Sequence, residues 1–389
     1  MGKGRNKNKE KESYTGCTRK GRVREESDSE ESISSHITFD DDMGSVLGDV
    51  TEDIDSPDFL NVLAEHIENA SHKNISIRLA ALRHLQIVLC SQCIPDFVSK
   101  WKLTLIDIIV KNLKRGDEEV AISALLLALV SLQIGEDISP EMEDPLAILR
   151  TIITDQSKSE QVRSLCALSI AISCHIASIN EESISACIKV LRSAWASTKL
   201  NAQETKLFTS SLAGWTLLLQ DADVVVQNIA FNEFSKLTSF LEADQLDIRI
   251  ATGEALAFLY EIGSINRPGF RLSNHQQIVE LLSSLCSDSS KGKTKKNKRV
   301  QRFTFRQIYS TIVDRNTPSM TIKFNRESLV LDSCYSKLLY DVFCELLHGG
   351  MVKQLQYNDL VRQLFDLGPV QTYDHREKPD KYAKINGSS

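Results

Sequence analysis

The sequence predicts an all-α protein built mainly from stacked pairs of helices. Its apolar content of 42% is ample for a large core, whereas aromatic residues make up only 6%. Gly (17) and Pro (8) are few for 389 residues, which suits helices better than an all-β fold. The most specific observation is a pattern of two helices that recurs about every 43 residues between Ser56 and Asp288.

The segment 1–55 is expected to be a disordered leader with two blocks of opposite charge. Met1–Arg24 contains nine Lys/Arg and two Glu, whereas Glu25–Asp55 contains twelve Asp/Glu and no Lys or Arg. Neither block holds enough apolar surface to offset the entropy lost on ordering. Three serines among the acidic residues are candidate sites for an acid-directed kinase, although an unmodified solvated tail fits as well; they are Ser27, Ser29 and Ser32.

Targeting and membrane signals are weak in this sequence. The first residues contain no apolar stretch typical of a secretory signal, and Asn6 stands where a myristoylation signal has Ser or Thr. The longest nearly apolar run, Val120–Ile134, is shorter than a membrane span. We therefore expect a soluble intracellular protein whose nine cysteines are reduced.

The second helix of each pair carries a repeated signature. Aligned on one position the helices follow at steps of 43, 42, 43 and 43 residues, and the anchors are Ile77, Val120, Val162, Thr205 and Ile248. The next position is usually cationic and holds Arg78, Ala121, Arg163, Lys206 and Arg249. Four residues after each anchor stands a residue of small or modest size, on a face where it lets the paired helix approach closely. We expect the cationic residues to bond neighbouring acids such as Asp117, Glu160 and Asp247 rather than a ligand.

A period near 43 residues with two helices per unit is typical of the armadillo/HEAT class of α-solenoid. The alternative is an ordinary helical domain with chance similarity, which five units in nearly constant register disfavour. No unit could bury its apolar faces alone, so stacking must stabilise the set. The predicted solenoid of about five repeats spans 56–288, and Asn274–Asp288 is its closing helix.

A basic segment follows the predicted solenoid. We expect residues 289–302 to be a flexible linker that serves as a nuclear address, a solvated hinge or a nucleic-acid contact, since cations that neutralise phosphates release counterions. Its cationic residues are Lys291, Lys293, Lys295, Lys296, Lys298, Arg299 and Arg302.

A small, mostly helical module is expected over 303–369. Phe305–Asp314 is helical by pattern, and Ser319–Phe324 alternates as a short strand does. A long amphipathic helix carries Leu331, Tyr335, Leu338, Val342 and Leu346 and ends at Gly349–Gly350. A last helix begins after Asn358 and ends at Leu367–Pro369, and 370–389 is expected to be a disordered tail.

Motifs that would carry chemistry are incomplete. Gly292-Lys293-Thr294 resembles the end of a phosphate-binding loop, but Ser287 stands where the first glycine is required. Cys90 and Cys93 have zinc spacing without a second pair of ligands, so thiols at a helix end are the favoured interpretation. The eight histidines form no metal-binding pattern. We therefore expect no enzymatic activity, no cofactor and no metal site.

The C-terminal module resembles the conserved C-terminal domain of the interferon-related developmental regulator family. The matching elements are Phe305-Arg306, the strand Thr321–Phe324, the segment Tyr340–Met351 and the Leu-Gly-Pro that ends at Pro369. The family's N-terminal region is an armadillo-like stack after a Ser/acidic leader, so the resemblance covers about Met43 to Pro369.

The resemblance implies a non-enzymatic regulator of gene expression in differentiation or growth control. Members act as transcriptional co-regulators that contact corepressor complexes, and one branch binds ribosomes and holds them inactive. Two departures are visible: Cys334 stands where members typically have Trp, and the basic helix that follows the Leu-Gly-Pro in many members is replaced by 370–389. The second departure disfavours ribosome silencing by a helix that fills a channel.

Two functional hypotheses therefore remain open. The first is a protein-interaction scaffold in nucleus and cytoplasm that acts as a transcriptional co-regulator. The second is a ribosome- or RNA-associated translational regulator. Neither requires a membrane or a small-molecule substrate.

Overall fold

The computed structural model describes residues 57–177, 179–287 and 295–370. Of the two compact units, Met1–His36 and Ile37–Ser389, only the second contains described residues. The leader with Ser27, Ser29 and Ser32, the cations Lys291 and Lys293, and the tail after Val370 all lie outside them.

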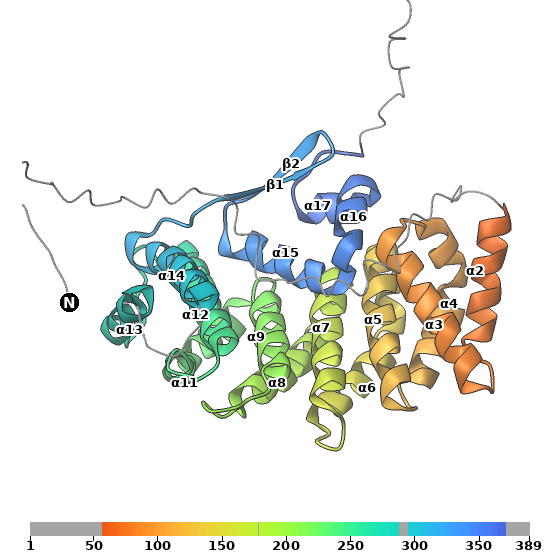
Figure 1. Cartoon of the computed structure of the whole chain (residues 1–389), viewed down its shortest axis with the longest axis horizontal. Helices are drawn as coiled ribbons and strands as arrows, with labels where there is room; N and C mark the ends of the chain where they lie inside the picture. The colour runs from red at the N-terminus through yellow and green to blue at the C-terminus, as the bar shows by residue number, and fades with distance from the viewer. Residues whose placement is uncertain (1–56, 178, 288–294, 371–389) are drawn as a thin grey trace, which may run out of the picture. The chain divides into compact units, whose positions relative to one another are not determined.

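Five helix pairs stand side by side in chain order (Figure 1). The first helices are α2 (Pro57–Asn69), α4 (Pro95–Asn112), α6 (Glu143–Thr154), α8 (Glu181–Ala196) and the two short helices α10 (Val224–Ala230) and α11 (Phe234–Phe240), which the turn η2 (Phe231–Glu233) connects. The second helices are α3 (Ile75–Ser91), α5 (Asp117–Ile134), α7 (Glu160–Ile176), α9 (Lys206–Leu218) and α12 (Leu246–Asn266). Each second helix packs against the second helices of the adjacent pairs, so the predicted armadillo/HEAT-like solenoid is confirmed.

Short polar residues begin several of these helices. The side chains of Asn74, Ser159 and Asn180 accept hydrogen bonds from backbone N–H groups in the first turns of α3, α7 and α8. Helix ends leave such groups unsatisfied, so these caps fix where each helix starts. Pro57 is the first residue of α2, a position that suits proline because it lacks only an N–H that would have no partner.

Helix α5 is apolar around its whole circumference because it is surrounded by protein. By length and composition α5 and the following turn η1 (Gly135–Glu141) are long enough to cross a membrane, but 72% of the apolar window is buried. It packs against α3, α4 and α7. Packing within the stack therefore accounts for its composition.

The basic segment differs from the flexible linker that we expected. Helix α13 (His275–Ser287) and helix α14 (Lys295–Tyr309) form a sixth pair, and α14 packs on α12. Val300, Phe305 and Ile308 are buried on α14. A Cβ added at Gly253 of α12 would lie 2.7 Å from Cδ1 of Ile308, so this glycine permits the close approach. Residues 295–302 are thus the first two turns of a packed helix.

The remaining chain forms a hairpin and three helices. After the π-helical turn η3 (Ser310–Asp314), strands β1 (Met320–Phe324) and β2 (Glu327–Leu331) pair antiparallel, with Met320 opposite Leu331. Asn325 in the connecting turn adopts φ 49°, a conformation that asparagine tolerates. Helices α15 (Cys334–Leu347), α16 (Met351–Tyr357) and α17 (Asp359–Leu364) follow, with the turn η4 (His348–Gly350) between α15 and α16.

One prediction for this module needs correction. Leu331 belongs to β2 and not to the amphipathic helix, because Ser333 caps α15 through its side chain and the helix starts at Cys334. Helix α15 ends at Leu347, just before the two glycines, and α16 begins directly after them. The strand at 320–324 and the Asn358 cap of α17 agree with the sequence analysis.

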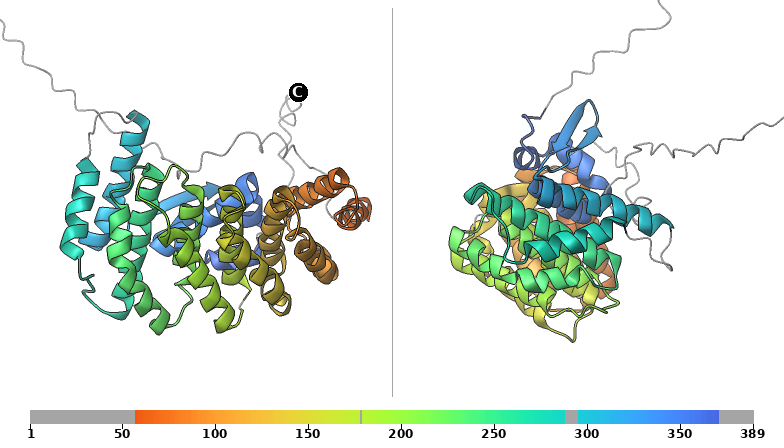
Figure 2. Two further views of the ribbon diagram at one scale, coloured as in Figure 1. Left: turned by 90° about the horizontal axis from the view of Figure 1, so that it is seen from below. Right: turned by 90° about the vertical axis from the view of Figure 1, so that its left-hand side faces the viewer.

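One hydrophobic core runs through the described part of the chain. Its buried side chains extend from Phe59 in α2 to Phe365 after α17, without a break between the solenoid and the C-terminal module. The views in Figure 2 show the C-terminal helices along one side of the stack. The module is therefore a part of the solenoid core.

Candidate functional site

The C-terminal helices cover the side of the stack that the second helices line (Figure 1). We call this side, formed by α3, α5, α7, α9 and α12, the second-helix face. Helix α15 contacts all five of these helices, α16 contacts α3, and α17 contacts α5. The surface that a solenoid would use for a long ligand is thus occupied by the chain itself.

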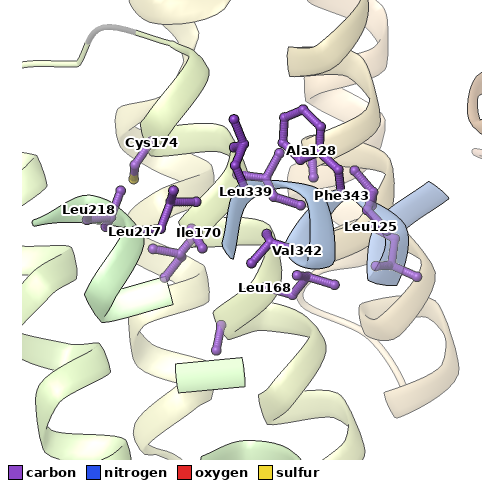
Figure 3. Close-up of a cluster of buried hydrophobic side chains, with 14 of the residues drawn as sticks. Leu125, Ala128, Leu168, Ile170, Cys174, Leu217, Leu218, Leu339, Val342 and Phe343 are labelled. Atoms are coloured by element: carbon purple, nitrogen blue, oxygen red, sulfur yellow. The ribbon is translucent and has the colours of Figure 1, made fainter. Parts of the chain in front are cut away.

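The cover is apolar along its centre (Figure 3). Leu339, Val342 and Phe343 of α15 are at most 3% exposed. They face residues of three second helices: Leu125 and Ala128 of α5, Leu168, Ile170 and Cys174 of α7, and Leu217 and Leu218 of α9. Burial of one such side chain typically contributes about 1.5 to 3 kcal/mol. Docking of α15 therefore rests mainly on the hydrophobic effect.

At one end of the cover, α16 binds buried backbone carbonyls at the end of α3. The Nε2 of Gln354 lies 3.1 Å from the carbonyl oxygen of Leu89 and 3.2 Å from those of Cys90 and Gln92. The Nε2 of Gln133 in α5 donates to the same Gln92 oxygen at 2.8 Å. The last carbonyls of a helix lack partners within the helix. Gln354 provides a hydrogen-bond donor for these carbonyls from a position 262 to 265 residues later in the chain.

Two neighbouring contacts hold α16 and α17 close to the stack. The Nδ2 of Asn358 donates to the carbonyl oxygen of Leu132 in α5 at 3.1 Å and to Oε1 of Gln354 at 2.9 Å. A Cβ added at Gly350 would lie 2.1 Å from the carbonyl oxygen of Cys90. Only glycine permits this approach of two backbones.

At the other end, Glu261 of α12 receives the start of α15. Its carboxylate accepts hydrogen bonds from the backbone N–H of Cys334 at 2.9 Å and of Tyr335 at 3.3 Å. A carboxylate at a helix N-terminus also interacts favourably with the helix dipole. Glu261 therefore acts as a cap supplied by another element.

A chain of three polar side chains connects α15, α7 and Asp221. The hydroxyl of Tyr335 lies 3.1 Å from Nε2 of His175, and Nδ1 of His175 lies 2.7 Å from Oδ2 of Asp221. Burial raises the pKa of Tyr335 to about 12. The phenol is therefore protonated at neutral pH and available as a donor.

One acid of the cover is held in an unfavourable environment. Glu345 of α15 accepts a hydrogen bond from Oγ of Ser210 at 3.4 Å. Burial raises its pKa, and Lys206 and Ser210 partly oppose that effect. Lys206, one of the signature residues, is itself exposed and lies at the start of α9.

The signature arginines Arg78 and Arg249 make equivalent contacts. Nη1 of Arg78 donates to the carbonyl oxygens of His72 and Lys73, and Nη1 of Arg249 donates to those of Ala243 and Asp244. Each then reaches the next second helix: Arg78 bonds the buried carboxylate of Glu119 on α5, and Nη2 of Arg249 donates to Oε1 of Gln301 on α14 at 3.0 Å. An acid partner of the kind that we expected is thus present for Arg78, whereas the corresponding contact of Arg249 is with the amide of Gln301.

The remaining signature contacts differ from those that we expected. Nε of Arg163 donates to the carbonyl oxygen of Ile153 at 2.8 Å. Among the expected acids, Asp117 pairs with Lys158 at 2.8 Å, and Glu160 accepts from the backbone N–H of Leu207 at the same distance. The acids that are near in sequence are not the partners of the signature residues, because stacking of the repeats brings together residues that are about 41 to 47 positions apart in the chain.

The anchor positions show one shift of register. Val120, Val162 and Ile248 are buried, whereas Ile77 is 41% exposed. Thr205 is half-buried and precedes α9, while the other four anchors lie two or three residues inside their helices. In α9 a close approach to α7 is made at Gly214, nine residues after the anchor. A Cβ at Gly214 would lie 2.9 Å from Cβ of Ala171 on α7.

Only part of the predicted basic cluster lies in the described residues. Lys295, Lys296, Lys298, Arg299 and Arg302 lie on α14, and Lys296, Arg299 and Arg302 are exposed. These cations belong to α14, whereas the contacts of the cover are made by α15, α16 and α17.

The thiol of Cys90 is buried in the core. Burial raises the pKa of Cys90 to about 12, and its Sγ lies 3.6 Å from the carbonyl oxygen of Leu346. Cys334, where the resemblance led us to expect Trp, opens α15 and is half-buried. In the described residues no three His, Cys, Asp or Glu side chains are grouped so that they could hold a metal ion.

Comparison with known proteins identifies the family. The family model described as Interferon-related developmental regulator matches residues 26–313. The chain belongs to this family. It is 32% identical over 310 residues to Interferon-related developmental regulator 1 of Homo sapiens, covering 76% of this chain and 69% of the human protein. It is 29% identical over 329 residues to Interferon-related developmental regulator 2 of Mus musculus, covering 80% of this chain and 74% of the mouse protein.

The family match and the sequence resemblance have different extents. The family model covers the acidic leader and the solenoid and ends in η3. Of the quoted motifs it includes Phe305-Arg306, while the strand at 321–324 and the later motifs lie beyond it.

Solved structures with a similar helix arrangement include designed armadillo repeat proteins. An engineered protein is 15% identical with a TM-score of 0.47, covering 65% of this chain and 98% of its own. A designed armadillo repeat protein in complex with peptide (KR)4 is 14% identical with a TM-score of 0.44, covering 64% of this chain and 99% of its own.

Most residues that join the C-terminal helices to the stack were missed by the sequence analysis. Gln354 and Glu261 are ordinary polar residues of helices, and Asn358 was noticed only as a helix cap. Their roles depend on partners more than 70 residues away. Gly350 was noticed, but as a helix stop rather than as a point of close approach.

Proposed function

We propose that this member of the family is a non-enzymatic protein-interaction scaffold that regulates gene expression in differentiation or growth control, as a transcriptional co-regulator. Support comes from its family and from a solenoid whose second-helix face is covered by its own C-terminal helices. Its partners are then regulatory complexes, including corepressors, that dock on the opposite side.

The observation that carries the proposal is the distribution of exposed apolar side chains. Several lie on first helices, including Leu103 of α4, which is 68% exposed. Three of them share the short helix α10: Val224, Val225 and Ile229, exposed by 57%, 68% and 59%. Single exposed apolar residues are common, but a group on one helix marks an interaction site.

Affinity purification of the full chain from cells, followed by mass spectrometry and a sucrose gradient, tests this function. We expect subunits of transcriptional regulatory complexes, and their loss in the double variant Val225→Asp/Ile229→Asp. Val330→Asp/Val352→Asp, at exposed apolar residues of β2 and α16, is the matched control for two added surface charges. Equal recovery from the double variant and the wild type would remove α10 from the proposal.

The second candidate is a ribosome- or RNA-associated translational regulator. The observation in its favour is the exposed cationic side of α14, since such charges suit phosphates. Co-migration with ribosomal subunits at both low and moderate salt would favour this candidate over the scaffold.

We also propose that the protein occupies both cytoplasm and nucleus, with the basic segment as the nuclear address. Replacement of Lys295, Lys296, Lys298 and Arg299 by Gln should then abolish nuclear accumulation. An unchanged distribution in fluorescence microscopy would exclude this address.

A further inference from the structure

The solvent side of α14 combines a row of cations with an aromatic side chain. Arg299, Arg302 and Arg306 recur at steps of three and four residues, and all three are exposed. Residues spaced in this way share one helix face. Lys296 extends the row at its start, and Phe303, which is 41% exposed, lies within it.

The opposite side of α14 fixes this row in place. Val300, Phe305 and Ile308 are buried against the stack, and Arg249 bonds Gln301 from α12. From Lys296 to Arg306 the helix rises by about 15 Å. The cations are therefore held on a rigid support, which costs a ligand less entropy than a flexible linker would.

Little in the described chain neutralises this row. No ion pair joins Lys296, Arg299 or Arg302 to an acid of the described residues. Other exposed cations do have such partners: Arg83 pairs with Glu118 and Arg192 with Glu233. The row on α14 therefore retains its positive potential.

A small pocket lies beside the end of the row. It has a volume of about 250 Å³ and is lined by Ser283 and Cys286 of α13 and by Arg306 and Tyr309 of α14. Arg306 thus belongs both to the cationic row and to the pocket wall. The pocket offers an aromatic ring and an apolar edge next to a cation.

We propose that this face of α14 binds the backbone of single-stranded nucleic acid, with phosphates on Arg299, Arg302 and Arg306 and bases on Phe303 and in the Tyr309 pocket. Proteins that hold single strands without reading sequence combine a cationic track with aromatic platforms in this way. A duplex hides its bases from such platforms. Phosphate contacts and stacking on aromatic rings do not depend on the sugar, so RNA and DNA single strands are expected to bind alike.

Fluorescence anisotropy with the full chain tests the proposal. The probes are a fluorescein-labelled 12-nucleotide oligouridylate, its deoxy counterpart and a duplex of equal length. The variant Arg299→Gln/Arg302→Gln should bind both single strands at least about tenfold more weakly near 0.1 M salt, with a shallower salt dependence. Phe303→Ala, which keeps every charge, should weaken binding about fivefold or more.

The control variant Lys100→Gln/Lys189→Gln removes two exposed charges from the first helices α4 and α8. Its affinity should stay within about twofold of the wild-type value. A loss equal to that of Arg299→Gln/Arg302→Gln would show that only net charge matters and would overturn the proposal. An unchanged affinity of Arg299→Gln/Arg302→Gln would also overturn the proposal. Binding through the cations of Met1–Arg24 would give that result. Equal affinity for the duplex or for polyglutamate would overturn the proposal as well.

Discussion

The signature arginines show what the repeated sequence pattern means for one residue. Arg78 and Arg249 each bond two carbonyls five and six residues earlier, and each then contacts the next second helix. One guanidinium thus joins the loop after a first helix, its own helix and the following repeat. A planar group with five donors suits this geometry, which explains why arginine recurs at the position.

Arg78 is expected to be important for stability because its partner is buried. The side chains of Arg78 and Glu119 are 7% and 3% exposed. Arg78→Ala leaves the carboxylate without its main partner and should lower the free energy of unfolding by about 3 to 5 kcal/mol. Arg83→Ala, which breaks the exposed pair with Glu118 one turn later, should cost less than about 1 kcal/mol. Urea denaturation followed by circular dichroism measures both, and equal losses would refute this account of the signature.

Glu345 makes the docking of α15 depend on pH. Burial raises its pKa, so the folded chain binds this proton more tightly than the unfolded chain. The free energy of unfolding therefore falls as the pH rises from the ordinary pKa of glutamate through the raised value. Glu345→Gln should be more stable than the wild type at pH 7 and equal to it near pH 4. Thermal melts at several pH values measure the difference, with the exposed Glu65→Gln of α2 as the control. A constant difference across the pH range would contradict the assignment.

At the scale of helices and strands, the period predicted the solenoid but not every boundary. Helix α9 begins one residue after its anchor. Thr205 provides no side-chain cap, and Glu160 of α7 accepts a hydrogen bond from the N–H of Leu207 instead. A cap from another repeat has no local sequence signal. The strand β2 was missed since Leu331 continued the apolar spacing of α15 by one turn.

Helix α14 shows how packing overrides composition. Six cations among its fifteen residues suggested a flexible linker. Three buried apolar residues and the gap left by Gly253 are enough to order it against α12. Most helical stability comes from tertiary contacts of this kind rather than from local preference.

Gly350 tests the close approach of the C-terminal helices to the stack. In Gly350→Ala the new Cβ meets the backbone oxygen of Cys90, which no side-chain rotation can relieve. We expect α16 to be displaced and the free energy of unfolding to fall by about 1 to 3 kcal/mol or more. Gly368→Ala is the matched control, because nothing lies within 4 Å of its Cβ. Similar melting temperatures for the two variants would contradict the contact.

At the scale of the whole molecule, the sequence predicted the two parts of the fold but not their union. Periodicity is a local property, and it revealed the pairs from α2 to α12. The contacts of Gln354, Asn358 and Tyr335 with the stack span 160 to 265 residues, and no spacing rule encodes them. The candidate residues on α14 were found from their charge, whereas their arrangement on one helix face required the structure.

The central claim is that the C-terminal helices are an integral cover of the second-helix face. This cover accounts for the apolar side of α15, for the glycine at position 350 and for the polar contacts at both ends. It leaves the first helices and α14 as the surfaces on which we propose that partners bind.

Hydrogen–deuterium exchange of the variant Phe343→Asp tests the cover most directly, since it places a charge between α15 and the stack (Figure 3). Amides of α5 and α7 should exchange faster than in the wild type, together with those of α15 to α17, while α2 should stay unchanged. Val330→Asp on the exposed side of β2 should alter none of these helices. Faster exchange confined to residues 334–370, with α5 and α7 as protected as before, would contradict the claim.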